Sequence, residues 1–127
     1  MSLKFFHDSH LISYRCPLGA APAGSILTIC LKVQGDTSVE TKVSLRFWQD
    51  DKGACLLEMS PASWEDDIYT VTFTLPQAGC LLWYYFKIRQ GEDLWYYGNN
   101  KDQKGGCGTT YTEEPPSFQI TVYDGES

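Results

Sequence analysis

The fold is decided by one stretch of the chain, Trp83-Tyr84-Tyr85-Phe86-Lys87-Ile88-Arg89. Tyr84, Phe86 and Ile88 occupy every second position, and the side chains between them carry a polar or charged end. Successive side chains of a β-strand point to opposite faces of a sheet, so this period of two predicts a strand with one buried face. No segment shows an apolar period of 3.6 residues over three turns, the pattern that would predict a helix.

Four further stretches repeat this alternation: Leu27–Val33, Val43–Trp48, Tyr69–Leu75 and Phe118–Tyr123. Shorter candidate strands are Phe5–Phe6, Leu11–Arg15, Ala54–Met59 and Leu94–Tyr97. Connectors containing glycine at 49–53 and 90–93 predict hairpin loops. About seven to nine short strands at such spacing predict an all-β fold, an immunoglobulin-like antiparallel β-sandwich. Residues 1–127 are expected to form this single domain, with one long irregular stretch at 98–114.

Length and charge exclude several classes of protein. The chain has 127 residues, a net charge of −6 and a pI near 4.7, so it lacks the basic surface that binds a phosphate backbone. Its 4 Trp, 8 Tyr and 6 Phe supply too much apolar surface for a disordered chain. No apolar run approaches the ~20 residues that span a bilayer, and a whole TIM barrel needs ~250 residues. We therefore expect neither nucleic acid nor a membrane as partner.

Cysteine usage favours the cytoplasm as the location of this protein. The five cysteines are an odd set without a C-x-x-C pair, and secreted domains usually carry even numbers. The first eight residues also lack the basic end and long apolar stretch of a signal peptide. Secretion with a signal peptide already removed stays open as the alternative.

Candidate catalytic and metal sites each have a simpler interpretation. His7 and His10 have a spacing that a metal could use, but no further ligand cluster accompanies them, so we expect a polar turn. The glycine-rich run 104–110 lacks the order of a phosphate-binding loop, and the acidic runs at 50–51, 65–67 and 92–93 fall in expected turns. We expect no catalytic constellation and no cofactor. A structural calcium held by Asn99, Asn100 and Asp102 is the one metal alternative kept.

The aromatic side chains divide by strand phase. Phe47, Tyr84 and Phe86 share the apolar phase and are expected in the core. The opposite phase carries the candidate contact residues, which the next hairpin strand extends: Trp48, Trp83, Tyr85, Lys87, Trp95 and Tyr97. Exposed rings beside polar groups suit stacking on sugar rings, and they suit docking of a protein domain equally well. A third interpretation, burial of all these rings, stays open.

Six motifs, taken in order, resemble one family: Phe6-His7-Asp8-Ser9, Tyr14-Arg15-Cys16-Pro17-Leu18-Gly19-Ala20, Val43-Ser44-Leu45-Arg46-Phe47-Trp48, Leu82-Trp83-Tyr84-Tyr85-Phe86, Tyr96-Tyr97-Gly98-Asn99-Asn100 and Phe118-Gln119-Ile120-Thr121-Val122-Tyr123-Asp124. The family is the N-terminal β-sandwich domain of bacterial glycoside hydrolase family 13 enzymes, the neopullulanase, cyclomaltodextrinase and α-amylase relatives. The chain also looks similar to starch-binding modules. The resemblance covers about residues 5–124.

The resemblance implies a non-catalytic domain of an α-glucan-hydrolysing enzyme. Its catalytic barrel, with the catalytic carboxylates, would follow this chain, and the domain would support that barrel and contact starch or maltooligosaccharide. In the resemblance such domains also mediate dimers, so a homodimer is a further expectation. The alternative is a free-standing immunoglobulin-like domain for protein interaction.

Overall fold

The computed structural model describes residues 3–49 and 52–124, which form β-strands and no helix. The strands are β1 (Lys4–Phe6), β2 (Arg15–Cys16), β3 (Ala21–Pro22), β4 (Ile26–Gln34), β5 (Thr41–Gln49), β6 (Gly53–Pro61), β7 (Ile68–Thr74), β8 (Cys80–Gln90), β9 (Asp93–Gly98), β10 (Thr109–Tyr111) and β11 (Phe118–Tyr123). The five alternating stretches all form strands, so the prediction of an all-β sandwich is confirmed.

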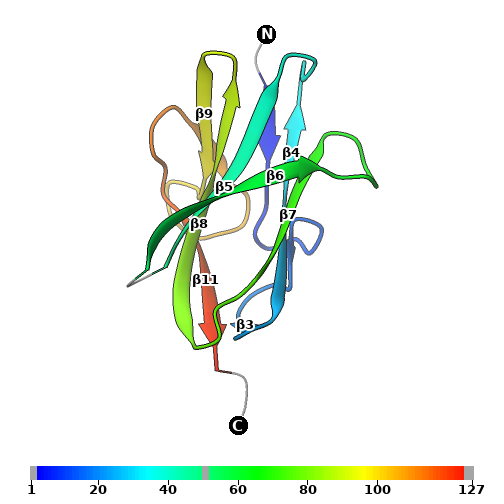
Figure 1. Cartoon of the computed structure of the whole chain (residues 1–127). Coiled ribbons are helices and arrows are strands. Elements are labelled where there is room, and N and C mark those ends of the chain that lie inside the picture. Colours follow the sequence, from blue (N-terminus) through cyan, green and yellow to red (C-terminus); the bar gives the residue numbers. More distant parts are fainter. Residues whose placement is uncertain (1–2, 50–51, 125–127) are drawn as a thin grey trace.

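The strands form two sheets that β6 joins. In one sheet β4 pairs with β1, β2 and β7, and in the other β8 lies between β5 and β11 and also pairs with β9. β6 runs along β5 as far as Met59 and then pairs with β7 through Ser60 and Pro61. Figure 1 shows β6 crossing the front of the molecule from β5 to β7. The result is a sandwich that is nearly closed along one side.

The core lies between the sheets, where the alternation of each strand places its apolar side chains. In β4, β8 and β11 every other residue is almost completely buried, and β5 adds two more. The main members are Leu27, Ile29, Leu31, Val33, Val43, Leu45, Leu82, Tyr84, Phe86, Ile88, Phe118, Ile120 and Val122. Burial of this much apolar surface is the dominant stabilising contribution to such a fold.

His7 lies inside this core, which differs from the polar turn that the sequence predicts. Its ring is fully buried between Phe86 and Phe118, with ring centroids 4.8 and 5.0 Å away. Its Nδ1 lies 2.8 Å from the Cys30 carbonyl oxygen, and its Nε2 lies 2.8 Å from the Tyr84 hydroxyl. Because a carbonyl can only accept, Nδ1 carries the proton and Nε2 accepts from Tyr84. Both nitrogens are thus occupied, and the ring is no metal ligand.

Three features differ from the predicted strands. The stretch 11–15 is mostly turn, because the Leu11 carbonyl accepts hydrogen bonds from the Tyr14 and Arg15 amides, and only Arg15 and Cys16 pair as a strand. The described residues form eleven strands rather than about seven to nine, since β3 and β10 are too short to show a period. β3 also pairs in parallel with β11, so the sandwich is not purely antiparallel.

Two expected loops have mixed outcomes. The hairpin at 90–93 forms between β8 and β9, with Gln90 opposite Asp93. The loop at 49–53 contains Asp50 and Asp51, which lie outside the described residues.

No disulfide joins the cysteines, all of which fall within the described part of the chain. No helix in residues 3–49 or 52–124 is long and apolar enough to cross a membrane.

Candidate functional site

The side chains of β5 and β8 that point away from the core form two facing rows, which we call the outer face. Across the two strands Trp48 lies opposite Trp83 and Arg46 lies opposite Tyr85. Towards the other end, Ser44 and Lys42 lie opposite Lys87 and Arg89. The register therefore separates an aromatic half of the outer face from a basic half, as strand alternation predicts.

Trp48 and Trp83 contact each other in the aromatic half. Their ring centroids are 5.0 Å apart with an interplanar angle of 43°, and both side chains are half-buried. Paired aromatic rings across two strands stabilise each other's orientation beyond the contribution of burial alone. The pair therefore presents a partly exposed aromatic surface of fixed orientation.

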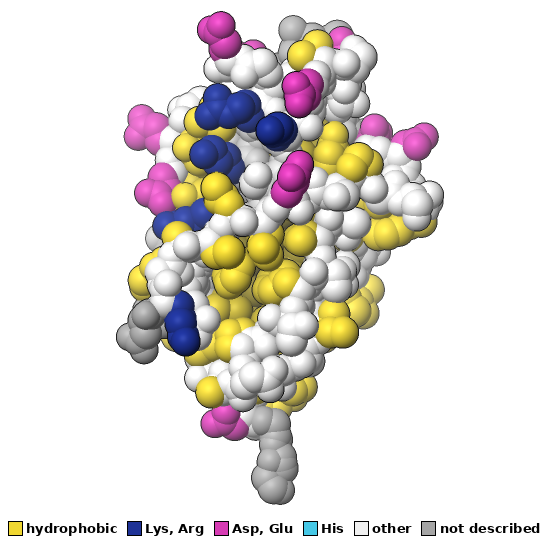
Figure 2. All heavy atoms as spheres, viewed as in Figure 1, with side chains coloured by type: hydrophobic (Ala, Val, Ile, Leu, Met, Phe, Trp, Pro, Cys, Tyr) yellow, Lys and Arg dark blue, Asp and Glu magenta, His cyan; other side chains and the backbone are white. Residues whose placement is uncertain are grey.

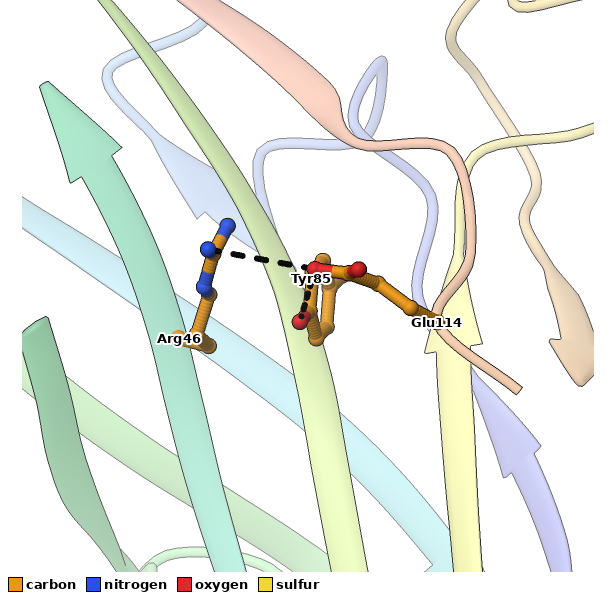
Figure 3. Close-up of polar contacts among 3 residues, drawn as sticks. All are labelled: Arg46, Tyr85 and Glu114. Atoms are coloured by element: carbon orange, nitrogen blue, oxygen red, sulfur yellow. Dashed lines mark hydrogen bonds and ion pairs between the residues drawn. The ribbon is translucent and has the colours of Figure 1, made fainter. Parts of the chain in front are cut away.

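Tyr85 points to the same side but is covered, which corrects the expectation of an exposed ring. Only 6% of it is exposed, and the Arg46 guanidinium lies 5.1 Å from its ring centroid. Its hydroxyl donates a 2.9 Å hydrogen bond to the Glu114 carboxylate, which also lies 3.8 Å from the Arg46 guanidinium (Figure 3). Tyr85 therefore supports Arg46 and cannot present its face to a sugar.

Burial of Tyr85 keeps its hydroxyl protonated. Loss of solvation and, second, the hydrogen bond to Glu114 raise the pKa of Tyr85 to about 12. The neutral hydroxyl is therefore a permanent donor at physiological pH, and it orients the carboxylate that meets Arg46.

Trp95 and Tyr97 lie on the inner face, so the expectation that they join the outer aromatic residues is wrong. They pair with Ile88 and Phe86 of β8, whose side chains are in the core. Trp95 packs against Phe5 with ring centroids 5.9 Å apart. The sequence held a signal for this register, because a two-residue loop places Gln90 opposite Asp93 and so fixes every later pair.

Tyr96 takes the outer position instead and helps to form a groove. It lies opposite Lys87, and its ring centroid is 5.8 Å from that of Tyr85. The groove has a volume of about 390 Å³ and is lined by Arg46, Ala54, Cys55, Leu56, Tyr85, Lys87 and Tyr96. Leu56 is 55% exposed at its edge. Of the predicted contact residues, Lys87 and Tyr85 line the groove.

The basic half gives the outer face a local charge opposite to that of the whole chain. The outer face carries four basic side chains, whereas the whole chain has a net charge of −6. Lys42, Lys87 and Arg89 lie in the basic half, and Arg46 lies beside it. Figure 2 shows Lys and Arg side chains gathered over the upper part of the visible face, above a hollow lined by hydrophobic side chains. Such a field favours association with an acidic surface.

Other candidate sites of the sequence are structural in this fold. The carboxamide oxygen of Asn99 accepts hydrogen bonds from the Asn100 and Gly105 amides, and that of Asn100 accepts from the Lys104 amide. These oxygens, which the sequence offered as calcium ligands, hold the loop at 99–106 closed. No group of three or more His, Cys, Asp or Glu side chains that could hold a metal occurs in residues 3–49 and 52–124.

Comparison with known proteins gives relatives of one kind. No family model matches the chain. It is 30% identical to an amylopullulanase of Thermoanaerobacter thermohydrosulfuricus and 32% identical to one of Thermoanaerobacterium saccharolyticum, in each case over 93% of this chain. The match spans only 8% and 9% of those relatives, respectively. The match therefore does not assign the activity of those whole proteins to this chain.

A solved structure shares the fold. A cyclomaltodextrinase matches 92% of this chain and 19% of its own length, with a TM-score of 0.59 and 15% sequence identity. At that identity the match supports the architecture alone. Sequence and fold together show that this chain is homologous to a short segment of amylopullulanases, and they fit a β-sandwich domain of a glycoside hydrolase family 13 enzyme.

Proposed function

We propose that this chain is a non-catalytic domain of an α-glucan hydrolase, and that its outer face contacts α-glucan chains beside the catalytic barrel. The single observation that carries the sugar contact is the Trp48–Trp83 pair, two half-buried rings held 5.0 Å apart. The C–H groups on the face of a glucose ring pack against indole rings, and neighbouring polar groups bond the hydroxyls.

The groove supplies those polar groups. Lys87 and Arg46 line it, and neither side chain is fully exposed. The Glu114 carboxylate and the Tyr85 ring fix the direction of Arg46. Groups held in place before binding lose less conformational entropy on binding. This favours recognition of a ligand that binds weakly, such as an oligosaccharide.

The same proposal makes this chain one domain of a longer enzyme. The relatives are large proteins of which the chain spans 6% to 9%, so a catalytic domain elsewhere in the full-length protein accounts for the match. The basic half of the outer face suits an acidic surface of that domain. We also propose that this domain precedes the barrel in the chain and that the protein forms a dimer.

Titration of the chain with maltoheptaose tests the sugar contact. We expect a saturable change in tryptophan fluorescence, and we expect Trp83→Ala to weaken binding roughly tenfold, because one of the two stacking rings is lost. Trp64→Ala is the matched control, since Trp64 is 64% exposed and lies outside the outer face. It is expected to leave the affinity unchanged.

Two results would contradict the sugar contact. One is an unchanged fluorescence at millimolar maltoheptaose and β-cyclodextrin. The other is an equal loss of affinity in Trp83→Ala and Trp64→Ala, which would show nonspecific stacking. Either result leaves the outer face for docking of a protein domain, whether the barrel or, in the alternative function, the partner of a free-standing interaction domain.

A further inference from the structure

A second pocket lies at the edge of the β8–β11 sheet and shares no lining residue with the outer groove. Its volume is about 280 Å³, and its lining includes Arg15, Ser9, Asn99 and Lys104. Three segments that are distant in sequence meet here: the turn before β2, the loop at 99–106 and the strand β11. The pocket is smaller than the cavities that hold drug-sized ligands, which suits a group of few atoms.

Arg15 is the buried charge of this pocket. Only 5% of the residue is exposed, and its guanidinium donates to the Gln119 and Gly19 carbonyl oxygens at 3.0 and 3.1 Å. Its Nε–H is buried and has no hydrogen-bond partner. An arginine has more N–H donors than two carbonyls use, so part of its hydrogen-bonding capacity is left over.

The positive charge of Arg15 also has no counterion among residues 3–49 and 52–124. No carboxylate of these residues lies within ion-pair distance of its guanidinium, and the one ion pair that they form joins Arg46 to Glu114, away from this pocket. The centroid of the Tyr84 ring lies 5.9 Å from its guanidinium carbon. A buried charge without a counterion is costly, so proteins usually pair such a group.

The rest of the lining favours negative charge. Lys104 and His10 border the pocket, and no Asp or Glu of the described residues lines it, although the chain is acidic overall. Ser9 is buried, and its Oγ accepts a 2.8 Å hydrogen bond from the Gly106 amide, which leaves the hydroxyl proton free to donate. Asn99 and Asn100 fix the loop that carries Lys104.

From these contacts we infer that the pocket binds a small oxyanion, with Arg15 as its main charge and Lys104 and Ser9 as additional donors. The shared chemistry is that of a carboxylate or phosphate group, since both offer oxygens that accept from a guanidinium fork. Two sources can supply it: an acidic side chain of a neighbouring polypeptide segment or a free phosphate. This site is independent of the sugar contact proposed for the outer face.

Amide and arginine Nε–H signals in ¹H–¹⁵N spectra test the site. The chain is titrated with sodium acetate and, separately, with sodium phosphate, each against sodium chloride of equal ionic strength. We expect saturable shifts at Arg15, Lys104 and Gly105 with at least one of the two oxyanions. Saturation by acetate identifies a carboxylate as ligand, whereas saturation by phosphate alone identifies a free phosphate group.

Variants separate a specific site from general charge effects. Lys104→Gln, on an exposed side chain, is expected to weaken oxyanion binding at least threefold without loss of the fold. Lys101→Gln is the matched control on the same loop, outside the pocket lining, and should bind as the unmodified chain does. Shifts that chloride reproduces, shifts that never saturate, or equal effects of the two lysine variants would each overturn the inference.

Discussion

Phe86→Ala is expected to lower the free energy of unfolding by about 3–5 kcal/mol, a large part of the stability of a single domain. Phe86 is completely buried at the centre of β8, where it lies opposite Leu45 on one side and Tyr97 on the other. Its ring also packs on that of His7, with centroids 4.8 Å apart. Removing it leaves a cavity that two paired strands cannot close, so the lost contacts are not replaced.

Urea denaturation followed by far-ultraviolet circular dichroism measures this change. Arg89→Ala is the matched control, because it lies on the same strand with its side chain exposed and is expected to change stability by no more than about 0.5 kcal/mol. A loss below about 1 kcal/mol for Phe86→Ala would be inconsistent with a closed core around β8.

The stability of the chain is expected to fall by about 2 kcal/mol between pH 7 and pH 5 because of His7. Burial, and secondarily the charge of Arg15, outweighs the hydrogen bond to Cys30 and lowers the pKa of His7 to about 3, from an ordinary value of 6.5. Below pH 6.5 the unfolded chain therefore binds a proton that the folded chain rejects. Protonation therefore stabilises the unfolded state increasingly as the pH falls to about 3. The contribution of neutral His7 to the free energy of unfolding is fully present only above pH 6.5.

Urea denaturation at a series of pH values tests the role of His7. His7→Gln is expected to be less stable at neutral pH but to lose most of the decline between pH 7 and pH 5. His10→Gln, at an exposed histidine three positions away, is the control and should retain the decline. If His7→Gln kept the full decline, the buried histidine would not be its cause.

The alternation of β8 predicted its core residues, because only one face of the sheet that contains β8 meets the opposite sheet. Tyr84, Phe86 and Ile88 are all completely buried, as expected. The same reasoning placed Trp48 and Trp83 on the outer face correctly. It failed at His7, because a single polar residue near a strand end has no periodicity, and only the packing of Phe86, Phe118 and Tyr84 around it reveals its environment.

The candidate site was predictable only in part. The phase of a residue gives the face of the sheet but not what covers that face, so Tyr85 was expected to be exposed although Glu114 and Arg46 cover it. Trp95 and Tyr97 were expected on the wrong face, because the alternation within β9 does not by itself fix how that strand aligns with β8. The contact roles of Trp48, Trp83, Lys87 and the other candidates, and the cytoplasmic location, stay predictions.

The sequence alone determined the fold class, because hydrophobic periodicity is a local property that each strand carries in its own residues. Its order of motifs also determined the resemblance that the amylopullulanase matches support. Only the tertiary structure decided how Tyr85 is covered and how Arg15 comes to be buried beside Lys104, with no carboxylate among the described residues that line the pocket. Those features join residues up to 104 positions apart, and no local pattern encodes contacts over such a separation.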